Sequence, residues 1–292
     1  MRWNKITLVG VGLLGGSLGL AVKRRRLARE VAGYVRRPAS VKECADAGAV
    51  DFATTDLLAA VWNADLVVLC TPVAQMRPLT ERMLPALKRG AIVTDVGSVK
   101  GSVVSELEPL VARAGAHFVG SHPMAGAEKM GVSAAQADLF AAAVCVVTPT
   151  ERTNAAALQS VMKFWRAVGC RVLKMPPQVH DALVSRSSHL PHLVAVALAS
   201  SVLDPRRPKP LSQLCANGFR DTTRIASSSP EMWRDIALAN RKQLRVALDE
   251  FVRELQRVQA ILRRGRPAEI LRLFEAAKRR RDAWCVRNAS PE

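Results

Sequence analysis

The chain has 292 residues, 49% of them hydrophobic, and a formal net charge of +18. This length is sufficient for one large domain or two ordinary ones. Basic residues occur along the whole chain, and there is only one Tyr, so little aromatic surface is available for stacking bases. The charge therefore predicts a solvated basic surface that attracts anionic small molecules, and argues against a nucleic-acid-binding arm.

The six cysteines show no C-x-x-C spacing, and several lie in apolar runs, so we expect reduced, buried thiols in a cytosolic protein. Five glycines interrupt the apolar stretch at residues 6–22, which argues against a signal peptide. The apolar stretch at residues 190–203 is too short to span a bilayer. We therefore expect a soluble, cytoplasmic protein.

The first predicted element is a buried strand at residues 5–9. It is followed by the segment Gly10-Val11-Gly12-Leu13-Leu14-Gly15 and by a helix that continues to about residue 27. A strand, G-x-G-x-x-G and a helix in this order are typical of dinucleotide binding. The first glycine permits a tight turn, the second lets the backbone approach a pyrophosphate, and the third lets the helix pack on the strand. The sequence therefore predicts that these six residues bind a dinucleotide, with phosphates at the helix N-terminus.

Strand and helix signals then alternate through the first half of the chain. Further strands are predicted at residues 31–35, 65–70, 91–95, 117–120, 143–148 and 171–174, and helices at residues 73–88, 99–114 and 153–168. This alternation predicts a doubly wound, mostly parallel Rossmann-type sheet. Ligands bind such sheets beyond the carboxyl ends of the strands. The residues at those ends that we expect to contact cofactor or substrate are Thr71, Pro72, Ser98 and His122.

The end of the second predicted strand bears on the choice of cofactor. An NAD-preferring site carries an Asp or Glu there, to accept from the ribose hydroxyls. Here Val35 takes that place, and Arg36 and Arg37 follow. Arginine pairs with a 2′-phosphate through charge-assisted hydrogen bonds. The sequence therefore predicts NADP, bound by Arg36 and Arg37, and leaves NAD as the alternative.

The second half of the chain is predicted to be helical. Residues 179–202 predict one long helix or two helices broken at Pro191, and further helices are predicted at residues 232–262 and 267–284. We expect a dinucleotide-binding domain at residues 1–175 and an all-helical substrate and dimerisation domain at residues 176–292. His180, His189 and His192 lie close together, but no Cys or carboxylate completes a ligand spacing, so no metal site is predicted.

Five motifs occur along the chain in a fixed order. They are GVGLLGGSLG at residues 10–19, DVGSVKG at 95–101, GSHPMAGAEKMG at 120–131, SHLPH at 188–192 and GFRDTTRIASSSPEMWRDI at 218–236. With these motifs the chain resembles the prephenate/arogenate (cyclohexadienyl) dehydrogenase family of tyrosine biosynthesis over nearly its whole length. The resemblance implies a Rossmann domain, a helical dimerisation domain and a homodimer. It also implies oxidative decarboxylation of prephenate to 4-hydroxyphenylpyruvate, or of arogenate to tyrosine.

The resemblance also implies roles for individual residues. His122 matches the family's catalytic histidine, and Ser98 matches its hydrogen-bonding partner. The substrate-binding residues implied in the same way are His192, Arg224, Glu128, Asp221 and Trp233. The sequence departs from the family pattern at Val35, where NAD-preferring members carry Asp, and at Ala127, where many members carry Thr.

The chemistry implied by the resemblance suits these residue types. A neutral histidine can accept the proton of the substrate's ring hydroxyl, because its ordinary pKa lies near the working pH. Arg224 can hold one carboxylate of a dicarboxylate substrate bidentately. One alternative is a β-hydroxy-acid dehydrogenase, which typically uses a lysine base in its helical domain. A second alternative is a dinucleotide-sensing or nucleic-acid-binding module, which needs no His122. The choice between prephenate and arogenate stays open.

Overall fold

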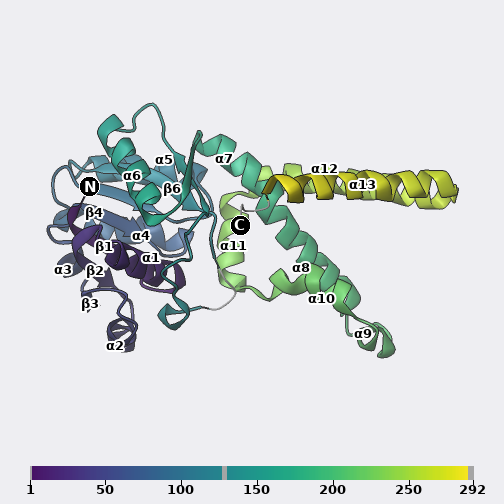
Figure 1. Cartoon of the computed structure of the whole chain (residues 1–292), viewed down its shortest axis with the longest axis horizontal. Helices are drawn as coiled ribbons and strands as arrows, with labels where there is room; N and C mark the ends of the chain where they lie inside the picture. The colour runs from purple at the N-terminus through teal and green to yellow at the C-terminus, as the bar shows by residue number, and fades with distance from the viewer. Residues whose placement is uncertain (1, 127–129, 289–292) are drawn as a thin grey trace. The chain divides into compact units, whose positions relative to one another are not determined.

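The computed structural model describes residues 2–126 and 130–288, and within them eight strands form one sheet (Figure 1). The strands are β1 (Trp3–Val9), β2 (Ala28–Tyr34), β3 (Phe52–Thr54), β4 (Leu66–Leu69), β5 (Ile92–Asp95), β6 (His117–Pro123), β7 (Val144–Thr148) and β8 (Arg171–Lys174). Their order is β3-β2-β1-β4-β5-β6-β7-β8, and only the pair β6–β7 is antiparallel among them. The predicted doubly wound, mostly parallel sheet is confirmed.

Helices cover both faces of this sheet. They are α1 (Leu13–Arg24), α2 (Pro38–Asp46), α3 (Leu57–Val61), α4 (Val73–Met83), α5 (Gly101–Ala112) and α6 (Ala155–Val168), with short 3₁₀ turns at Leu84–Ala86 and Val132–Ala134. Side chains alternate between the two faces along each strand. In β4, Leu66 and Val68 join the core under α1 and α6, whereas Val67 and Leu69 join the core under α3, α4 and α5.

The second half of the described chain is helical, as predicted. It contains α7 (Pro177–Val184), a π-helical segment η3 (Ser185–His189), α8 (Leu190–Val202), α9 (Pro210–Gln213), α10 (Asn217–Thr223), a 3₁₀ turn η4 (Arg224–Ser227), α11 (Pro230–Ala239), α12 (Arg241–Arg264) and α13 (Pro267–Asn288). Residues 177–202 form one helical path in which the wide π turn precedes Pro191. The π turn widens the helix just before Pro191, at the position where the proline lacks an N–H for the helical ladder.

The prediction of one helix at residues 232–262 is wrong at Asn240. Helix α11 ends there, and α12 begins at Arg241. The Asn240 side chain donates to the backbone oxygen of Asp181 at 3.0 Å and contacts Nδ1 of His189 at 3.2 Å. These tertiary hydrogen bonds override the helical periodicity at this position. Strand β3 was not predicted either, because three partly exposed residues carry little alternation.

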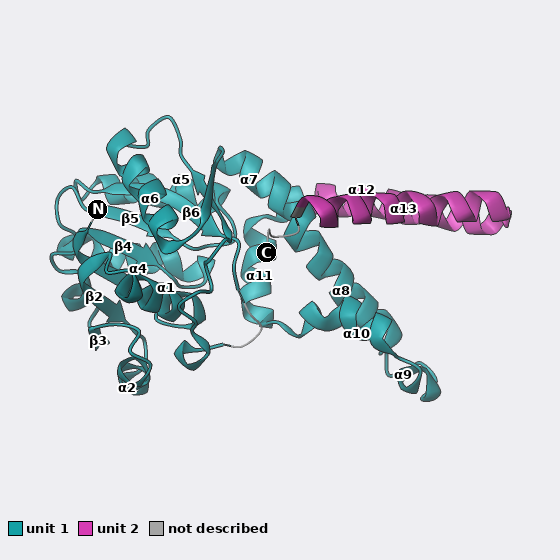
Figure 2. Cartoon of the chain, in the orientation of Figure 1, with its two compact units in different colours: residues 1–243 teal, residues 244–292 magenta. Residues whose placement is uncertain are grey.

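The chain divides into two compact units, Met1–Gln243 and Leu244–Glu292 (Figure 2). The second unit contains most of α12 and all of α13, which are joined through Gly265 at a φ of 63°. The predicted domain boundary after residue 175 falls between β8 and α7 and stays a prediction. The six cysteines are free, but only Cys44, Cys145 and Cys170 are buried as expected. Within the described residues, no helix has the length and apolar character needed to cross a membrane.

Candidate active site

The glycine-rich segment makes a tight turn from β1 into α1. Gly10 has a φ of 97°, and a Cβ at this position would lie 2.8 Å from Cγ2 of Thr71. A Cβ on Gly15 would lie 2.0 Å from the carbonyl oxygen of Gly10, a separation that no side chain tolerates. Both positions therefore require glycine, as the fingerprint predicts.

The space above this turn fits an anionic group. A Cβ on Gly12 would meet no atom within 4 Å, so the backbone there is open to a ligand. Helix α1 begins directly after Gly12 and has no capping side chain, which leaves the N–H groups of its first turn available. Oγ1 of Thr71 is buried and has no hydrogen-bond partner within the described residues. These features fit the pyrophosphate and ribose of a nicotinamide dinucleotide.

The residues that follow β2 lie on the surface. Val35 is buried, and the side chains of Arg36 and Arg37 are exposed. Arg37 contacts Oγ of Ser40 at 3.2 Å and the Glu43 carboxylate at 3.6 Å. Arg36 forms no ion pair with any described residue. The guanidinium of Arg36 is thus the more available of the two for a ligand phosphate.

The sequence placed His122 just beyond the end of a strand at residues 117–120. In the structure His122 lies inside β6. The parallel pairing of β6 with β5 ends at Val119, but the strand continues and pairs antiparallel with β7, where His122 lies opposite Val146. The change of partner lengthens the strand past the edge of the parallel sheet. His122 is consequently buried, with 7% of its surface exposed, and its backbone direction is set by the sheet.

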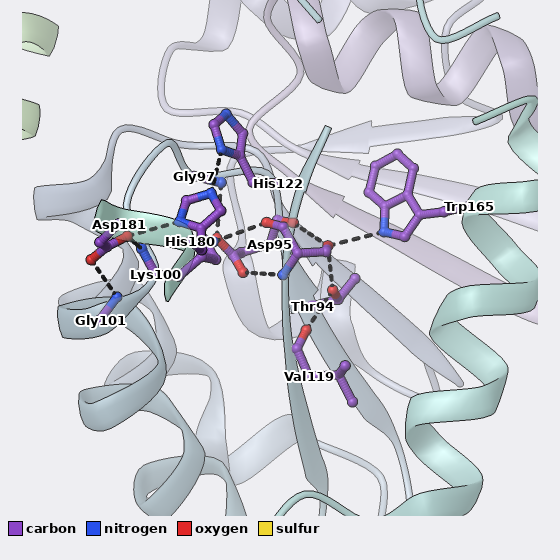
Figure 3. Close-up of polar contacts among 11 residues, drawn as sticks. Thr94, Asp95, Gly97, Lys100, Gly101, Val119, His122, Trp165, His180 and Asp181 are labelled. Atoms are coloured by element: carbon purple, nitrogen blue, oxygen red, sulfur yellow. Dashed lines mark hydrogen bonds and ion pairs between the residues drawn. The ribbon is translucent and has the colours of Figure 1, made fainter. Parts of the chain in front are cut away.

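The imidazole of His122 is the end of a hydrogen-bonded series (Figure 3). Its Nδ1 lies 2.9 Å from Nε2 of His180, and Nδ1 of His180 lies 2.8 Å from Oδ1 of Asp181. Both partners come from α7. The Asp181 carboxylate also accepts the backbone N–H groups of Lys100 and Gly101, each at 2.8 Å. Since α5 has no capping side chain of its own, Asp181 takes that place at its N-terminus.

A buried ion pair joins the strands next to this series. Lys100, which is fully buried, pairs with Asp95 at the end of β5 and donates to the Ser121 carbonyl at 2.9 Å. Asp95 in turn accepts the Ser121 N–H at 3.0 Å, and Trp165 donates its indole N–H to the Ser121 hydroxyl at 2.9 Å. Burial lowers the pKa of Lys100, and the Asp95 carboxylate opposes that shift. The network fixes the backbone immediately before His122.

Ser98 is not the hydrogen-bonding partner of His122 in this structure. Nδ1 of His122 bonds to His180, and within the described residues no hydrogen bond joins the His122 ring to the Ser98 hydroxyl. Ser98 lies instead beside His189. Burial lowers the pKa of His189 to about 4, and a hydrogen bond with the Ser98 backbone opposes that shift. Helix α7 instead brings the His180 ring directly against Nδ1 of His122.

The other two histidines of the helical half pack with Trp233. His192 stacks on the indole, with ring centroids 3.4 Å apart and planes 11° apart, and His189 meets it edge-on at 6.0 Å. Nε1 of Trp233 is buried without a hydrogen-bond partner among the described residues. Because Asn240 joins His189 to the backbone of Asp181, this aromatic group is connected to the His122 series. A buried, unpaired indole N–H suits a ligand oxygen.

Burial keeps the imidazoles of His122, His189 and His192 neutral at ordinary pH. It lowers the pKa of His122 well below the usual 6.5, and positive charge on His180, Lys100 or His189 acts in the same direction. Burial likewise lowers the pKa of His189 to about 4, and it lowers the pKa of His192. A neutral imidazole at His122 is ready to accept a proton.

The remaining predicted substrate residues lie on the segment that follows α8. Asp221 is in α10 and Arg224 begins η4, and both side chains are exposed. Both elements pack against α8, the helix that carries His192. Glu128 lies outside the described residues. Within those residues, no group of three or more His, Cys, Asp or Glu side chains could hold a metal ion.

Two family models match this chain in sequence. The model described as prephenate dehydrogenase, nucleotide-binding domain, matches residues 18–174, and the model described as prephenate dehydrogenase, dimerization domain, matches residues 176–276. The chain belongs to the prephenate dehydrogenase family.

Individual relatives agree with the prephenate dehydrogenase models. The chain is 34% identical to the prephenate dehydrogenase of Bacillus subtilis over 97% of its own length and 77% of that protein. The Aquifex aeolicus prephenate dehydrogenase, solved with hydroxyphenyl propionate and NAD+, has 34% identity and a TM-score of 0.89, covering 97% of this chain and 99% of that one. Synechocystis arogenate dehydrogenase has 31% identity and a TM-score of 0.81, covering 96% and 99%. The chain is therefore an NAD(P)-dependent oxidoreductase.

The prephenate dehydrogenase motifs contained part of what the sequence analysis missed. Asp95 and Lys100 belong to DVGSVKG, and an Asp at a strand's carboxyl end with a Lys five residues later is a signal that the sequence shows, whereas the burial of Lys100 is not. His180 was noted only within a histidine cluster, and Asp181 was not singled out. Their pairing with His122 spans 58 residues of sequence, so no local pattern indicates it.

Proposed function

We propose that this chain catalyses the oxidative decarboxylation of prephenate or arogenate with hydride transfer to NAD(P). One observation carries the proposal most strongly: a buried, neutral imidazole, His122, lies at the edge of the parallel sheet in a chain whose two halves both match the prephenate dehydrogenase models. The B. subtilis, A. aeolicus and Synechocystis relatives support the same reaction by their names.

The chemistry assigns one proton transfer to His122. The substrate ring carries a hydroxyl and a hydrogen on one sp³ carbon, with a carboxylate across the ring. When bound, the nicotinamide supplies the hydride acceptor. Nε2 of His122 accepts the hydroxyl proton as the ring carbon loses hydride and becomes a carbonyl. Loss of CO2 then makes the ring aromatic, and the phenolate oxygen takes the proton back, so His122 returns to its neutral form.

Residues of the helical half bind the substrate in this proposal. We assign Arg224 to a substrate carboxylate, because a guanidinium binds it bidentately and fixes both position and charge. The unpaired indole N–H of Trp233, held by its stack on His192, supplies a further donor. Ser98 is kept as a substrate or cofactor contact rather than as the partner of His122. Glu128 and Asp221 remain predicted substrate residues.

A four-way assay tests the proposed function. Reduction of NAD+ and NADP+ is followed at 340 nm, a wavelength set by the reduced nicotinamide, with prephenate and with arogenate as substrate. We expect turnover with at least one substrate, and stoichiometric CO2 release. Absence of turnover in all four combinations by a folded protein contradicts the proposal.

We also propose that NADP is preferred, because Val35 replaces the acid that would bind the ribose hydroxyls and Arg36 is available for a 2′-phosphate. Replacing Arg36 and Arg37 together with Ala is expected to raise the KM for NADP about tenfold or more, since a charge-assisted contact contributes about 1.5–3 kcal/mol. The KM for NAD should change little. Lys42→Ala, an exposed cation on the adjacent α2, is the matched control. An equal response of both cofactors identifies the arginines as surface residues.

We further propose a homodimer formed through the helical half. The matched dimerization-domain model and the exposed apolar side chains of the second compact unit support this. Those side chains include Leu248, Val252, Leu255, Leu262, Leu271 and Phe274. Exposed large apolar side chains in this number on two neighbouring helices support a protein interface there.

A further inference from the structure

We propose that His180 and Asp181 are positioning residues that fix the tautomer of His122, so that its Nε2 carries no proton and faces the substrate. The inference rests on the proposed function, in which His122 is the base. It follows from the direction of each hydrogen bond in the series Asp181–His180–His122 (Figure 3).

The first step concerns Asp181. Two of its hydrogen bonds come from the backbone N–H groups of Lys100 and Gly101, which can only donate. These two donors favour the ionised form of Asp181, and an ionised carboxylate only accepts hydrogen bonds. Nδ1 of His180, 2.8 Å from Oδ1, must therefore be the donor in that bond. The N-terminus of α5, where these two N–H groups lie, further favours the negative charge.

The second step concerns the two rings. A neutral imidazole has one N–H and one acceptor nitrogen, so a proton on Nδ1 of His180 leaves Nε2 as the acceptor. That nitrogen lies 2.9 Å from Nδ1 of His122, which must then carry the proton. His122, kept neutral by burial, has its lone pair on Nε2.

The opposite polarity is disfavoured by the surroundings. In the opposite arrangement, Nε2 of His180 donates to Nδ1 of His122. Nδ1 of His180 then either has no proton and faces the Asp181 carboxylate as a second acceptor, or His180 carries a proton on both nitrogens. The titratable groups that face the series are Lys100 and Asp95, which pair with each other, and His189 from η3, which is neutral. When His122 accepts the substrate proton, its Nδ1–H bond to His180 is kept, and the Asp181 carboxylate lies one ring away.

The tautomer can be read directly in the wild-type enzyme. The chain has five histidines, so selective ¹⁵N labelling gives few signals, and long-range ¹H–¹⁵N spectra of the full chain distinguish Nδ1–H from Nε2–H. Assignment uses His122→Asn and His180→Gln. We expect Nδ1–H on both His122 and His180, without and with NADP+. A wild-type His122 with its proton on Nε2 overturns the inference whatever the enzyme's activity.

Two substitutions test the effect on catalysis. His180→Leu removes the acceptor, and kcat is expected to fall about 10–100-fold, the range found when a residue that orients a functional histidine is lost. The KM values for substrate and cofactor should stay nearly unchanged. His180→Gln keeps an oxygen near the position of Nε2, and it should recover most of the lost kcat.

A double-variant cycle separates positioning from a structural role. If His180 acts only through His122, then His180→Leu added to His122→Asn lowers kcat by no more than about twofold. A further loss of about 10–100-fold in the double variant overturns the inference. Lack of turnover with both substrates, combined with the expected tautomer, contradicts the proposed function and supports the inference, because the spectra need no substrate.

Discussion

Replacing His122 with Asn is expected to lower kcat about 10²–10⁴-fold, the usual contribution of a positioned base. Asn keeps a polar side chain of similar reach, so the hydrogen bond to His180 can be retained and the fold should persist. Cofactor affinity should also be retained, because the glycine-rich turn at Gly10–Gly15 is remote from the substitution in sequence and on a different strand. Steady-state kinetics and cofactor titration measure both effects.

The pH dependence gives a second measurement for His122. Activity requires the neutral ring, so kcat/KM rises with pH through the pKa of His122. Burial holds that pKa below 6.5, so the limb lies on the acid side of 6.5 and the rate is level through neutrality. The sequence alone had suggested a limb near neutrality. The same burial destabilises the fold as pH falls below the ordinary histidine value, because the unfolded chain binds the proton more readily. Circular dichroism over that range separates unfolding from titration.

His117→Asn is the matched control, because His117 begins the same strand, β6, at the other end from His122. Its kinetics and pH limb should equal those of the wild type. Near-normal turnover with an unchanged acid limb in His122→Asn shows that the base lies elsewhere, and His189 and His192 are then the next groups to replace.

Replacing Arg224 with Ala is expected to raise the KM for substrate. Loss of a bidentate charged contact costs about 2–5 kcal/mol, which corresponds to roughly 30-fold to several thousandfold. The KM for NAD(P) should change little, since the glycine-rich turn lies on the other half of the chain. Parallel titrations of substrate and cofactor measure the two constants.

Arg207→Ala serves as the control for Arg224, because it removes the same charge from an exposed position before α9. It should leave the substrate KM near the wild-type value. Circular dichroism of Arg224→Ala detects any loss of helix, since Arg224 also begins a 3₁₀ turn. An unchanged substrate KM in a folded Arg224→Ala protein removes this residue from the binding site.

The sheet was predictable because its strands are short apolar runs that each end at a turn. Residues 65–70 predicted β4, observed at Leu66–Leu69, and the G-x-G-x-x-G segment predicted the turn that only glycine can make at Gly15. These features are local, so the sequence carries them within a few residues. The same holds for β8, whose predicted and observed bounds agree.

The parts that could not be predicted depend on tertiary partners. β6 continues through His122 because β7 pairs with it antiparallel, and no residue of β6 indicates that change of partner. The break at Asn240 depends on Asp181 and His189, which lie 59 and 51 residues away in the sequence. The family resemblance implied Ser98 as the partner of His122, whereas α7 supplies His180.

The hydrogen bonds of Asp181 limit which helical modules can be exchanged between relatives of this enzyme. The two family-model matches meet between residues 174 and 176, and that junction separates His122 from His180 and Asp181. The nucleotide-binding module therefore supplies the imidazole of His122, and the helical module supplies the residues that orient it. Exchange of helical modules between relatives would preserve nucleotide binding, yet it would give an active chimera only if the incoming module began with an equivalent histidine–aspartate pair that reached the N-terminus of α5.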